Sequence, residues 1–536
     1  MKRKIFYCVL FLMMLCKAEA QLIVSSGGTV FLEVGSVINV QGNLTISSDI
    51  QGTGKISLSG TAAQLNANGF IIPNLDINSA GSIALTGNCI VSTSLNFSLG
   101  KIQLGNSQFT LSSSATITGV SGTKFIETTG NGLVKKELAS NGNYTIPVGA
   151  NNQYMPLSYT VSAGSFGAGA FLGTQLLNAV HPNKPLRAED YLNQYWKTTT
   201  NNITGAVINA TANYQDASSF IGNEISLNAL RWDGANWSSA NNAIDVTANT
   251  ITYNNIVSGN DLYAMNKFVL ARAKVFLQGA YNAGTGLMGD NLRTVPCLIP
   301  TSDPYRTAPY NIASFSHFNN TVTETVNASV FNTQLNINDN IVDWVFLELR
   351  DVNNILLQTR SALLQRDGDI VDIDGTGPVF FKNIDAGNFV LSVRHRNHLG
   401  VGAEAATYAK TLNLSEPSTA NVYDFTTASD AQIFGTSAAY TTASHPTLSS
   451  INLLWGGNAN FNVNTKYTGL QNDKDYILVT TLGNSSSLVL SNIYSPADIN
   501  MNRAVRFNGL GNDKDFLYIT ILGSSTTNQR VQALPN

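Results

Sequence analysis

The chain has 536 residues, of which 12% are charged, and a formal net charge of −3. It holds no long run of basic residues, which argues against nucleic acid as a partner because phosphate attraction dominates such binding. Asn, Thr, Ser and Gly are abundant, and the Lys-Glu-Leu blocks of helical proteins are absent. The composition therefore favours strands with polar exposed faces, and the length predicts about three or four domains.

Residues 1–20 are expected to form a signal peptide. A basic start is followed by an apolar run and by Ala18-Glu19-Ala20, an A-x-A cleavage pattern. A membrane anchor is the alternative, but the apolar run is about half of the ~20 residues needed to span. A lipoprotein at Cys16 would require a small residue where Leu15 stands.

Cleavage after Ala20 predicts an exported chain without a transmembrane segment. The expected location is extracellular or on the outer cell surface, with the periplasm as an alternative. Cys89 and Cys297 would be the remaining cysteines, and export leaves a single bridge between them open.

Residues 21–130 repeat short alternating units such as "GNLTI", "PNLDI", "GKISL" and "GKIQL". Alternation places Ile56 and Leu58 on one face of a strand, and likewise Ile102 and Leu104. Short strands with Gly or Asn corners predict a parallel β-solenoid-like region. An open sandwich is the alternative, because the spacing of the units is irregular.

Residues 131–272 are predicted to form a β-sandwich. "NGNYTIPVG" contains turn signals between strands, and "WDGANW" indicates a tight hairpin with Asp-Gly as its turn. Trp196, Trp232 and Trp237 are candidates for stacking on a glycan, with burial in the sandwich core as the alternative.

Residues 273–415 are predicted to form a second β-sandwich, immunoglobulin-like or transthyretin-like. "IVDWVFLELRD" is typical of a buried core strand. "LQRDGDIVDIDG" is typical of a hairpin around Asp367-Gly368, which would place Asp372 and Asp374 on one solvent face. A metal site or a catalytic carboxylate pair among Asp367, Asp369, Asp372 and Asp374 is the alternative. The pattern "SVRHRNHLG" is expected to be a strand with His395 and His398 on opposite sides at the surface.

Residues 416–536 contain two copies of one pattern, "NANFNVNTKYTGLQNDKDYILVTTLG" and "DINMNRAVRFNGLGNDKDFLYITILG". Asn472 and Asn512 precede acidic residues, and a Gly follows each apolar run, which predicts short capped helices. The β-branched residues in these runs keep strands as the alternative.

The segments "KVFLQGAY", "LQRDGDIVDIDG", "SVRHRNHLG" and the paired "KYTG…NDKD" and "RFNG…NDKD" resemble the C-terminal half of large secreted surface proteins of Bacteroidota. Those proteins are described as haemagglutinin- or adhesin-like, and the resemblance is best over residues 270–536. It implies export, a surface location and a small dockerin-like C-terminal repeat region, here degenerate.

A dockerin-like loop would bind calcium through oxygen ligands at alternating positions and would need a Gly between them. The second copy places Arg503 at the Gly position, and the first copy offers Asn458, Asn460 and Asn462 without a carboxylate. We expect the loops to be held by Asn side chains bonded to their own backbone, so no cofactor is required. If the second loop does bind calcium, its candidate ligands are Asp498, Asn500, Asn502, Asp513 and Asp515.

The sequence contains no G-x-S-x-G, H-E-x-x-H or P-loop pattern. We therefore expect a mainly β, multi-domain, non-catalytic adhesin or scaffold that binds a surface glycan or a protein. The alternatives are a carbohydrate-binding accessory protein and, third, a polysaccharide-degrading enzyme.

Overall fold

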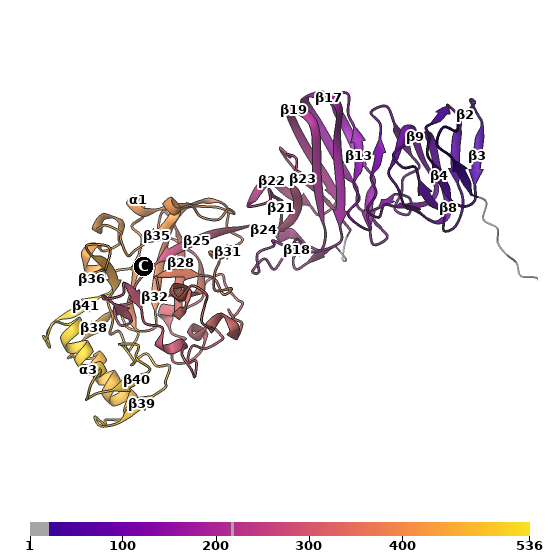
Figure 1. Cartoon of the computed structure of the whole chain (residues 1–536). Helices are drawn as coiled ribbons and strands as arrows, with labels where there is room; N and C mark the ends of the chain where they lie inside the picture. Colours follow the sequence, from indigo (N-terminus) through magenta and orange to yellow (C-terminus); the bar gives the residue numbers. More distant parts are fainter. Residues whose placement is uncertain (1–20, 216–218, 536) are drawn as a thin grey trace, which may run out of the picture. The chain divides into compact units, whose positions relative to one another are not determined.

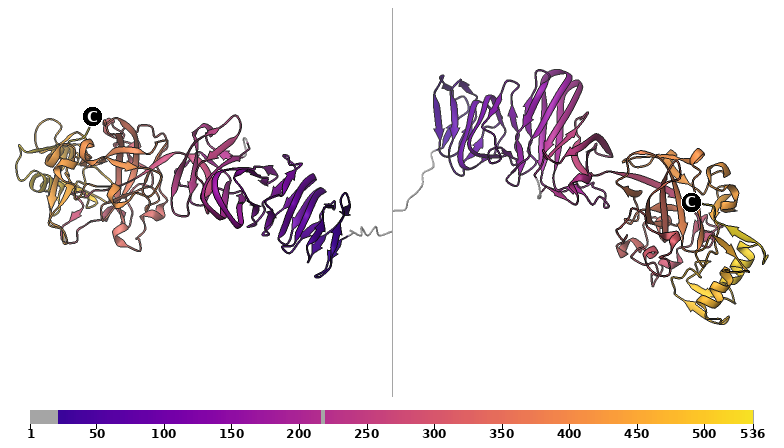
Figure 2. Two further views of the ribbon diagram at one scale, coloured as in Figure 1. Left: turned by 90° about the horizontal axis from the view of Figure 1, so that it is seen from above. Right: turned by 180° about the vertical axis from the view of Figure 1, so that it is seen from behind.

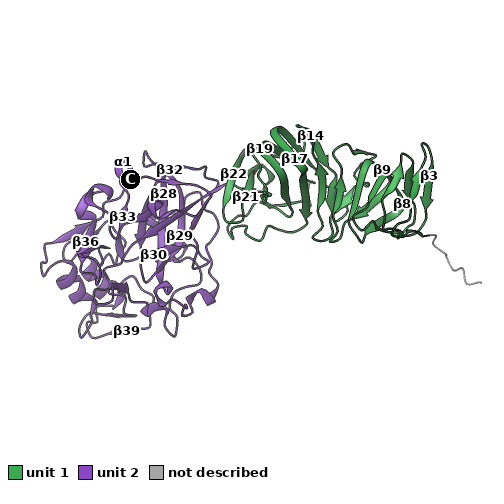
Figure 3. Ribbon diagram, turned by 45° about the horizontal axis from the view of Figure 1, so that its top comes forward, with its two compact units in different colours: residues 1–266 green, residues 267–536 purple. Residues whose placement is uncertain are grey.

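The computed structural model describes residues 21–215 and 219–535, so the expected signal peptide lies outside the described residues. The chain forms two compact units, one ending at Asn266 and the other beginning at Lys267 (Figure 3). Strands hold 45% of the residues and helices 10%, so the predicted mainly β class is confirmed. The predicted boundary at residues 272/273 lies close to the division between the units.

The first part of unit 1 is β-solenoid-like, as predicted, with short parallel strands stacked coil on coil (Figures 1 and 2). The strands fall into three columns, and each strand pairs with the strand one coil further along the chain. The first three coils contain β1 (Leu22–Val24), β2 (Val30–Leu32), β3 (Val37–Val40), β4 (Leu44–Ile46), β5 (Ile50–Gly52), β6 (Lys55–Leu58) and β7 (Gln64–Asn66). The later coils contain β8 (Ile71–Leu85), β9 (Cys89–Gln103), β10 (Phe109–Leu111), β11 (Thr116–Thr118) and β12 (Ile126–Glu127).

Like residues lie above one another in these columns. Leu22 is opposite Leu44, Leu44 is opposite Leu65, and Ile56 is opposite Leu75. From the second coil onwards these inward side chains are buried. Each coil thus adds one layer to an aliphatic core, while the alternate side chains point outwards.

The strands of residues 131–266 are mostly antiparallel and belong to the same sheet as the solenoid strands. The longest pair is β17 (Leu157–Leu177) with β19 (Tyr195–Asn213), and β13 (Val134–Glu137) joins β17 to the solenoid strand β10. The other strands are β14 (Gly142–Ile146), β15 (Val148–Ala150), β16 (Gln153–Tyr154), β18 (Tyr191–Leu192), β20 (Phe220–Ile221), β21 (Leu227–Trp232), β22 (Trp237–Asp245), β23 (Thr250–Tyr253) and β24 (Asp261–Asn266).

Unit 2 is built on a nine-stranded sheet with β28 (Ile341–Asp351) near its centre. Every residue of β28 from Ile341 to Arg350 is buried, as expected of a central strand that is covered on both faces. The other strands of this sheet are β25 (Phe268–Lys274), β29 (Leu356–Gln365), β30 (Asp369–Val371), β31 (Val379–Lys382), β32 (Gly387–His395), β33 (His398–Gly402), β34 (Lys410–Leu412) and β35 (Val422–Asp424).

The covering segments of unit 2 contain small hairpins and single helical turns. The hairpins are β26 (Tyr281–Asn282) with β27 (Leu287–Met288) and β36 (Tyr440–Ala443) with β37 (Ile451–Leu454). The longer turns are α1 (Ala405–Tyr408), η5 (Ala328–Phe331) and η9 (Thr436–Ala439). Tyr305, Phe315 and Phe331 pack from these segments onto the core of the sheet. In the parts of the chain that the structure describes, no helix has the length and apolarity needed to cross a membrane.

Candidate functional site

The two C-terminal repeats adopt the same local structure forty residues apart. In the first, β38 (Asn464–Lys466) leads to α2 (Asp473–Asp475), the π-helical turn η10 (Tyr476–Thr481) and β39 (Val489–Ser491). In the second, the elements are β40 (Ala504–Arg506), α3 (Asp513–Asp515), η11 (Phe516–Ile521) and β41 (Gln529–Val531). The predicted helices and their caps are confirmed, because Asn472 and Asn512 accept from the backbone N–H of Asp475 and Asp515.

The repeats complete each other's strand pairs. β38 of the first repeat pairs with β41 of the second, and β40 of the second pairs with β39 of the first. The registers correspond, since Asn464 lies opposite Val531 and Ala504 lies opposite Ser491. A shared core that includes Ile477 and Leu517 lies between the repeats. The repeats therefore form one unit with approximate two-fold symmetry.

The five predicted calcium ligands use their oxygens within the chain. Asp498 accepts from the backbone N–H of Asn502 and Arg503 at 2.9 Å each, and Asp513 accepts from Ile499 and Arg506. The side-chain oxygens of Asn500 and Asn502 accept from backbone N–H groups two residues further along. Asp515 accepts from Asn512 and lies 3.1 Å from Lys514.

As expected, Asn side chains of the second loop bond to the backbone of their own loop. The structure brings Asp498 and Asp513 near each other, and it leaves the side chain of Asp515 46% exposed beside Lys514. Burial raises the pKa of Asp498 to about 6 and that of Asp473, in the first repeat, to about 8. Burial, followed by the Asp498 charge, also raises the pKa of Asp513.

The three candidate glycan-stacking tryptophans lie in unit 1. Trp196 is 0% exposed, and its indole N–H donates to the carbonyl of Met155 at 3.1 Å. Trp232 and Trp237 face each other across the predicted hairpin and pack around the buried His181. Stacking on a sugar requires an accessible ring face, so the prediction is wrong for Trp196 and for Trp237, which is 4% exposed. Trp232 is half-buried.

His395 and His398 do not lie on opposite sides of one strand at the surface, and that expectation is wrong. β32 ends at His395 and β33 begins at His398, so Arg396 and Asn397 form a tight turn and the two histidines lie opposite each other. Their Nδ1 atoms are 3.1 Å apart, and both rings are buried. The turn was missed because "RHRN" contains no Gly or Pro to mark it.

The hydrogen bonds of these histidines fix which nitrogen carries the proton. The backbone N–H of Gly279 donates to Nε2 of His398 at 3.0 Å, so the proton of neutral His398 is on Nδ1. That proton faces the side-chain oxygen of Asn397 at 2.8 Å and Nδ1 of His395 at 3.1 Å, and Nε2–H of His395 donates to Asp343 at 3.1 Å. The chain of bonds is complete with both rings neutral. In agreement, burial lowers the pKa of His395 and His398.

Asp343 and Arg396 link the sheet to the C-terminal repeats. Arg396 Nε donates to Asp343 at 2.7 Å, and its Nη1 donates to the carbonyl of Ser495. The Tyr494 hydroxyl donates to the other oxygen of Asp343 at 2.7 Å, and its ring lies beside the guanidinium. Burial acts to raise the pKa of Asp343, but Arg396 and these hydrogen bonds outweigh it and hold the pKa below its usual range.

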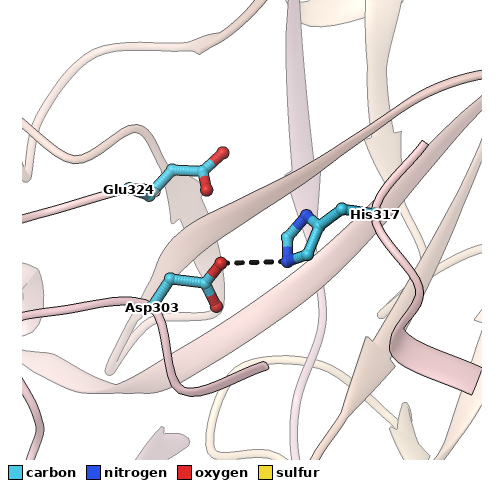
Figure 4. Close-up of side chains that lie close together, drawn as sticks. All are labelled: Asp303, His317 and Glu324. Atoms are coloured by element: carbon cyan, nitrogen blue, oxygen red, sulfur yellow. Dashed lines mark ion pairs between the residues drawn. The ribbon is translucent and has the colours of Figure 1, made fainter. Parts of the chain in front are cut away.

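A second buried polar cluster contains Asp303, His317 and Glu324, which sequence spacing did not reveal. Their ligand-type atoms lie within 4.8 Å of one another, and the Nε2 of His317 is 3.0 Å from Asp303 Oδ2 (Figure 4). Three such groups are a familiar ligand set for a transition metal.

Two arginines oppose a cation at this cluster. Arg306 Nε lies 3.3 Å from Asp303 Oδ2, and Arg360 Nε donates to Glu324 at 2.9 Å. Arg360 also donates to Asp372 at 2.7 Å, so Asp372 is buried in this network and is not on the predicted solvent face beside the exposed Asp374. Guanidinium groups this close repel a divalent ion, which favours an ion-pair network over a metal centre.

An exposed apolar pair occurs at the same place in both repeats. Leu470 is 87% exposed and Leu510 is 96% exposed, and each follows the Gly of the "TGL" or "NGL" segment. Val479 and Ile519 on the following helical turns are 45% and 55% exposed. A hollow of ≈ 590 Å³ is lined by Leu470, Val479 and neighbouring polar residues. No sequence motif marks this pair, because exposed leucines have no local signature.

Compared with known proteins, the chain matches no family model, no curated protein and no solved structure.

Proposed function

We propose that the chain is an exported, non-catalytic attachment or scaffold protein that binds a protein partner through its C-terminal repeats. We propose that it is adhesin-like, with β-sandwiches in residues 131–415 and a degenerate dockerin-like region at its C-terminal end. Its partner is a protein surface with apolar patches, which Leu470 and Leu510 contact.

The duplicated exposed pair is the observation that carries this proposal. Near-complete exposure of a leucine costs free energy in water, about 25 cal/mol per Å² of apolar surface. Here the exposure recurs at equivalent positions of two repeats, whereas the equivalent Ile477 and Leu517 are buried in the shared core. Selective exposure of this kind is typical of interaction surfaces.

The polar clusters support a role without chemistry. The ion pairs Asp343–Arg396 and Glu324–Arg360 lie in the interior of unit 2, where they hold segments distant in the sequence together. A catalytic acid and base would have to lie within reach of a substrate.

The test measures binding of the purified chain to cell-envelope fragments of the organism that produces it, by surface plasmon resonance. The double variant Leu470→Asp/Leu510→Asp should lose at least tenfold in affinity, since each Asp places a charge in an apolar contact. Leu335→Asp is the matched control, because Leu335 is fully exposed in the same unit but outside the repeats.

Treatment of the envelope separates a protein ligand from a glycan. Protease digestion should abolish binding, and periodate oxidation of sugars should not. Binding that survives protease but not periodate would establish the carbohydrate-binding alternative. Binding that is indifferent to the double substitution would refute a role of the repeats.

A further inference from the structure

The first coil of the solenoid, residues 21–40, differs from the coils that follow it in its outward side chains. Ile23 is 60% exposed, Phe31 64% and Val37 52%, one in each of the three columns. The residues directly opposite them in the second coil are polar and are Thr45, Gln51 and Lys55. All three columns thus change from polar to apolar at the same end of the stack.

The same coil has an open backbone edge. Among the described residues, β1, β2 and β3 each pair with one strand only, which belongs to the second coil. Their inward side chains are also incompletely covered, since Leu22, Val30 and Ile38 are partly exposed, whereas Leu44, Ile50 and Ile56 of the second coil are buried. Unpaired N–H and C=O groups and an uncovered core end are what a neighbouring strand layer would satisfy.

This edge lacks the usual protection against pairing. Natural edge strands carry charges, particularly Lys, or Pro, which prevent another chain from adding to the sheet. Residues 21–40 contain neither Lys nor Pro, and their one charged residue, Glu33, follows β2 in a corner of the coil. The second coil, in contrast, places Lys55 in the third column.

We propose that two copies of the chain associate first coil to first coil. In such a two-fold pair the order of strands round the coil is reversed, so β2 lies antiparallel to β2 of the second copy and β1 lies beside its β3. Phe31 then meets Phe31 of the second copy, and the strand of Ile23 lies beside the strand of Val37. The apolar outward residues cover one another, as cross-strand pairs do, and all three open strands gain a partner.

A second copy fits this edge better than an unrelated strand. A partner must offer three short strands at the spacing of the coil and an apolar outward side chain on each, and the first coil itself has both properties. The coil spans residues 21–40, close to the number of residues that one partner contributes to a standard interface, about 20–30. This inference is independent of the C-terminal repeats and of their partner.

The experiment determines the mass of the full chain, isolated after export, by sedimentation velocity. We expect a dimer at about 100 μM, since interfaces of this size reach micromolar affinity or tighter. Phe31→Lys places two ammonium groups against each other on the two-fold axis and should raise the dimer dissociation constant at least tenfold. Gln51→Lys, one coil inwards in the same column, is the matched control and should leave the dimer intact.

Cross-linking then locates the contact. In a Cys297→Ser background, which removes the exposed free thiol, Phe31→Cys should give a covalent dimer with a short bismaleimide, and Gln51→Cys should not. Because Phe31 is an exposed side chain, neither variant should change the circular dichroism spectrum.

Three results would overturn the inference. They are a monomer at the highest concentration, a dimer that Phe31→Lys does not weaken, or equal cross-linking from positions 31 and 51. A monomer in which hydrogen exchange protects residues 22–40 as strongly as the second coil would show that another segment of the same chain covers this edge.

Discussion

Along the solenoid of unit 1 the interior holds aliphatic side chains stacked on like neighbours, whereas the sheet of unit 2 buries Asp343, Arg360 and Arg396. Both regions are rich in strands, but they specify their structures differently. A solenoid strand finds its partner about one coil away in the sequence. Arg396 and Tyr494, in contrast, are brought to Asp343 from segments far along the chain.

Because of this difference, the two regions should tolerate amino-acid substitutions differently. Aliphatic columns accept another aliphatic residue at modest cost, because packing is nondirectional. A buried ion pair adds little net stability, yet removal of one partner leaves a charge in the interior and is strongly destabilising. The stability of unit 2 should therefore depend on a few residues, whereas the stability of the solenoid should be the sum of many small contributions.

The largest expected effect is that of Arg396→Met. The substitution leaves the Asp343 carboxylate buried beside His395 without its cation, and we expect unit 2 to lose about 3–5 kcal/mol of unfolding free energy. Urea denaturation followed by hydrogen-exchange mass spectrometry measures this loss and assigns it to residues 267–535.

Two controls sharpen that result. Arg396→Lys keeps the charge and should restore part of the stability, so equal losses from Met and Lys would contradict the charge argument. Leu75→Ala in the solenoid removes a fully buried aliphatic side chain, and we expect a loss of about 2–5 kcal/mol confined to unit 1. If either substitution also destabilised the other unit, the two units would not differ in the way described above.

A smaller effect should follow from pH. The pKa of His398 is lowered in the folded chain, so the unfolded chain binds a proton first as the pH falls below about 6.5. The contribution of His398 to stability is thus complete above that pH and is lost as the pH falls. For one fully protected histidine, the slope is at most about 1.4 kcal/mol per pH unit.

Buried carboxylates of the repeats act in the opposite direction. The folded chain raises the pKa of Asp473 to about 8 and that of Asp498 to about 6, so their contributions are complete at acid pH and are lost as the pH rises. The variant His398→Gln, whose side-chain oxygen can accept from Gly279, separates the contribution of the histidine to the pH dependence of stability from that of the carboxylates. From pH 7 to pH 5 the stability of the variant should rise relative to that of the wild type, and a difference that does not change with pH would contradict the assigned neutral state.

The smallest expected effect is that of chelation. Because Asp498 and Asp513 already accept backbone hydrogen bonds, EDTA should shift the Tm of unit 2 by less than about 2 °C, or about 1 kcal/mol. A fall of more than about 10 °C that calcium restores would show that the loops hold a tightly bound ion.

The sequence predicted local features of the fold well. Alternation and turn residues predicted the solenoid-like strands, the Trp232–Trp237 hairpin and the Asp367-Gly368 turn, since these depend on neighbouring residues. The order of the strands in the sheet was harder to predict. "GNLTI" at 42–46 and "PNLDI" at 73–77 look alike but lie in different columns, because the column of a strand depends on corner lengths that have no residue signature.

Side chains that meet over long sequence distances could not be predicted. The link between Arg306, Glu324 and Arg360 depends on the packing of two segments onto a strand of the sheet, and no spacing in the sequence predicts it. His395 and His398 were misplaced for a local reason, an unmarked two-residue turn. The exposed Leu470 and Leu510 were missed because an apolar residue beside a helix is expected to be buried.

The exchange of strands between the two repeats has a consequence for biosynthesis. Residues 464–466 pair with residues 529–531. The first repeat therefore cannot complete this strand pair until nearly the whole of the second repeat has been translated. Until then its apolar helix lacks the other half of its core and is a natural client for a chaperone. A nascent chain halted between the two copies would leave that apolar surface exposed to water.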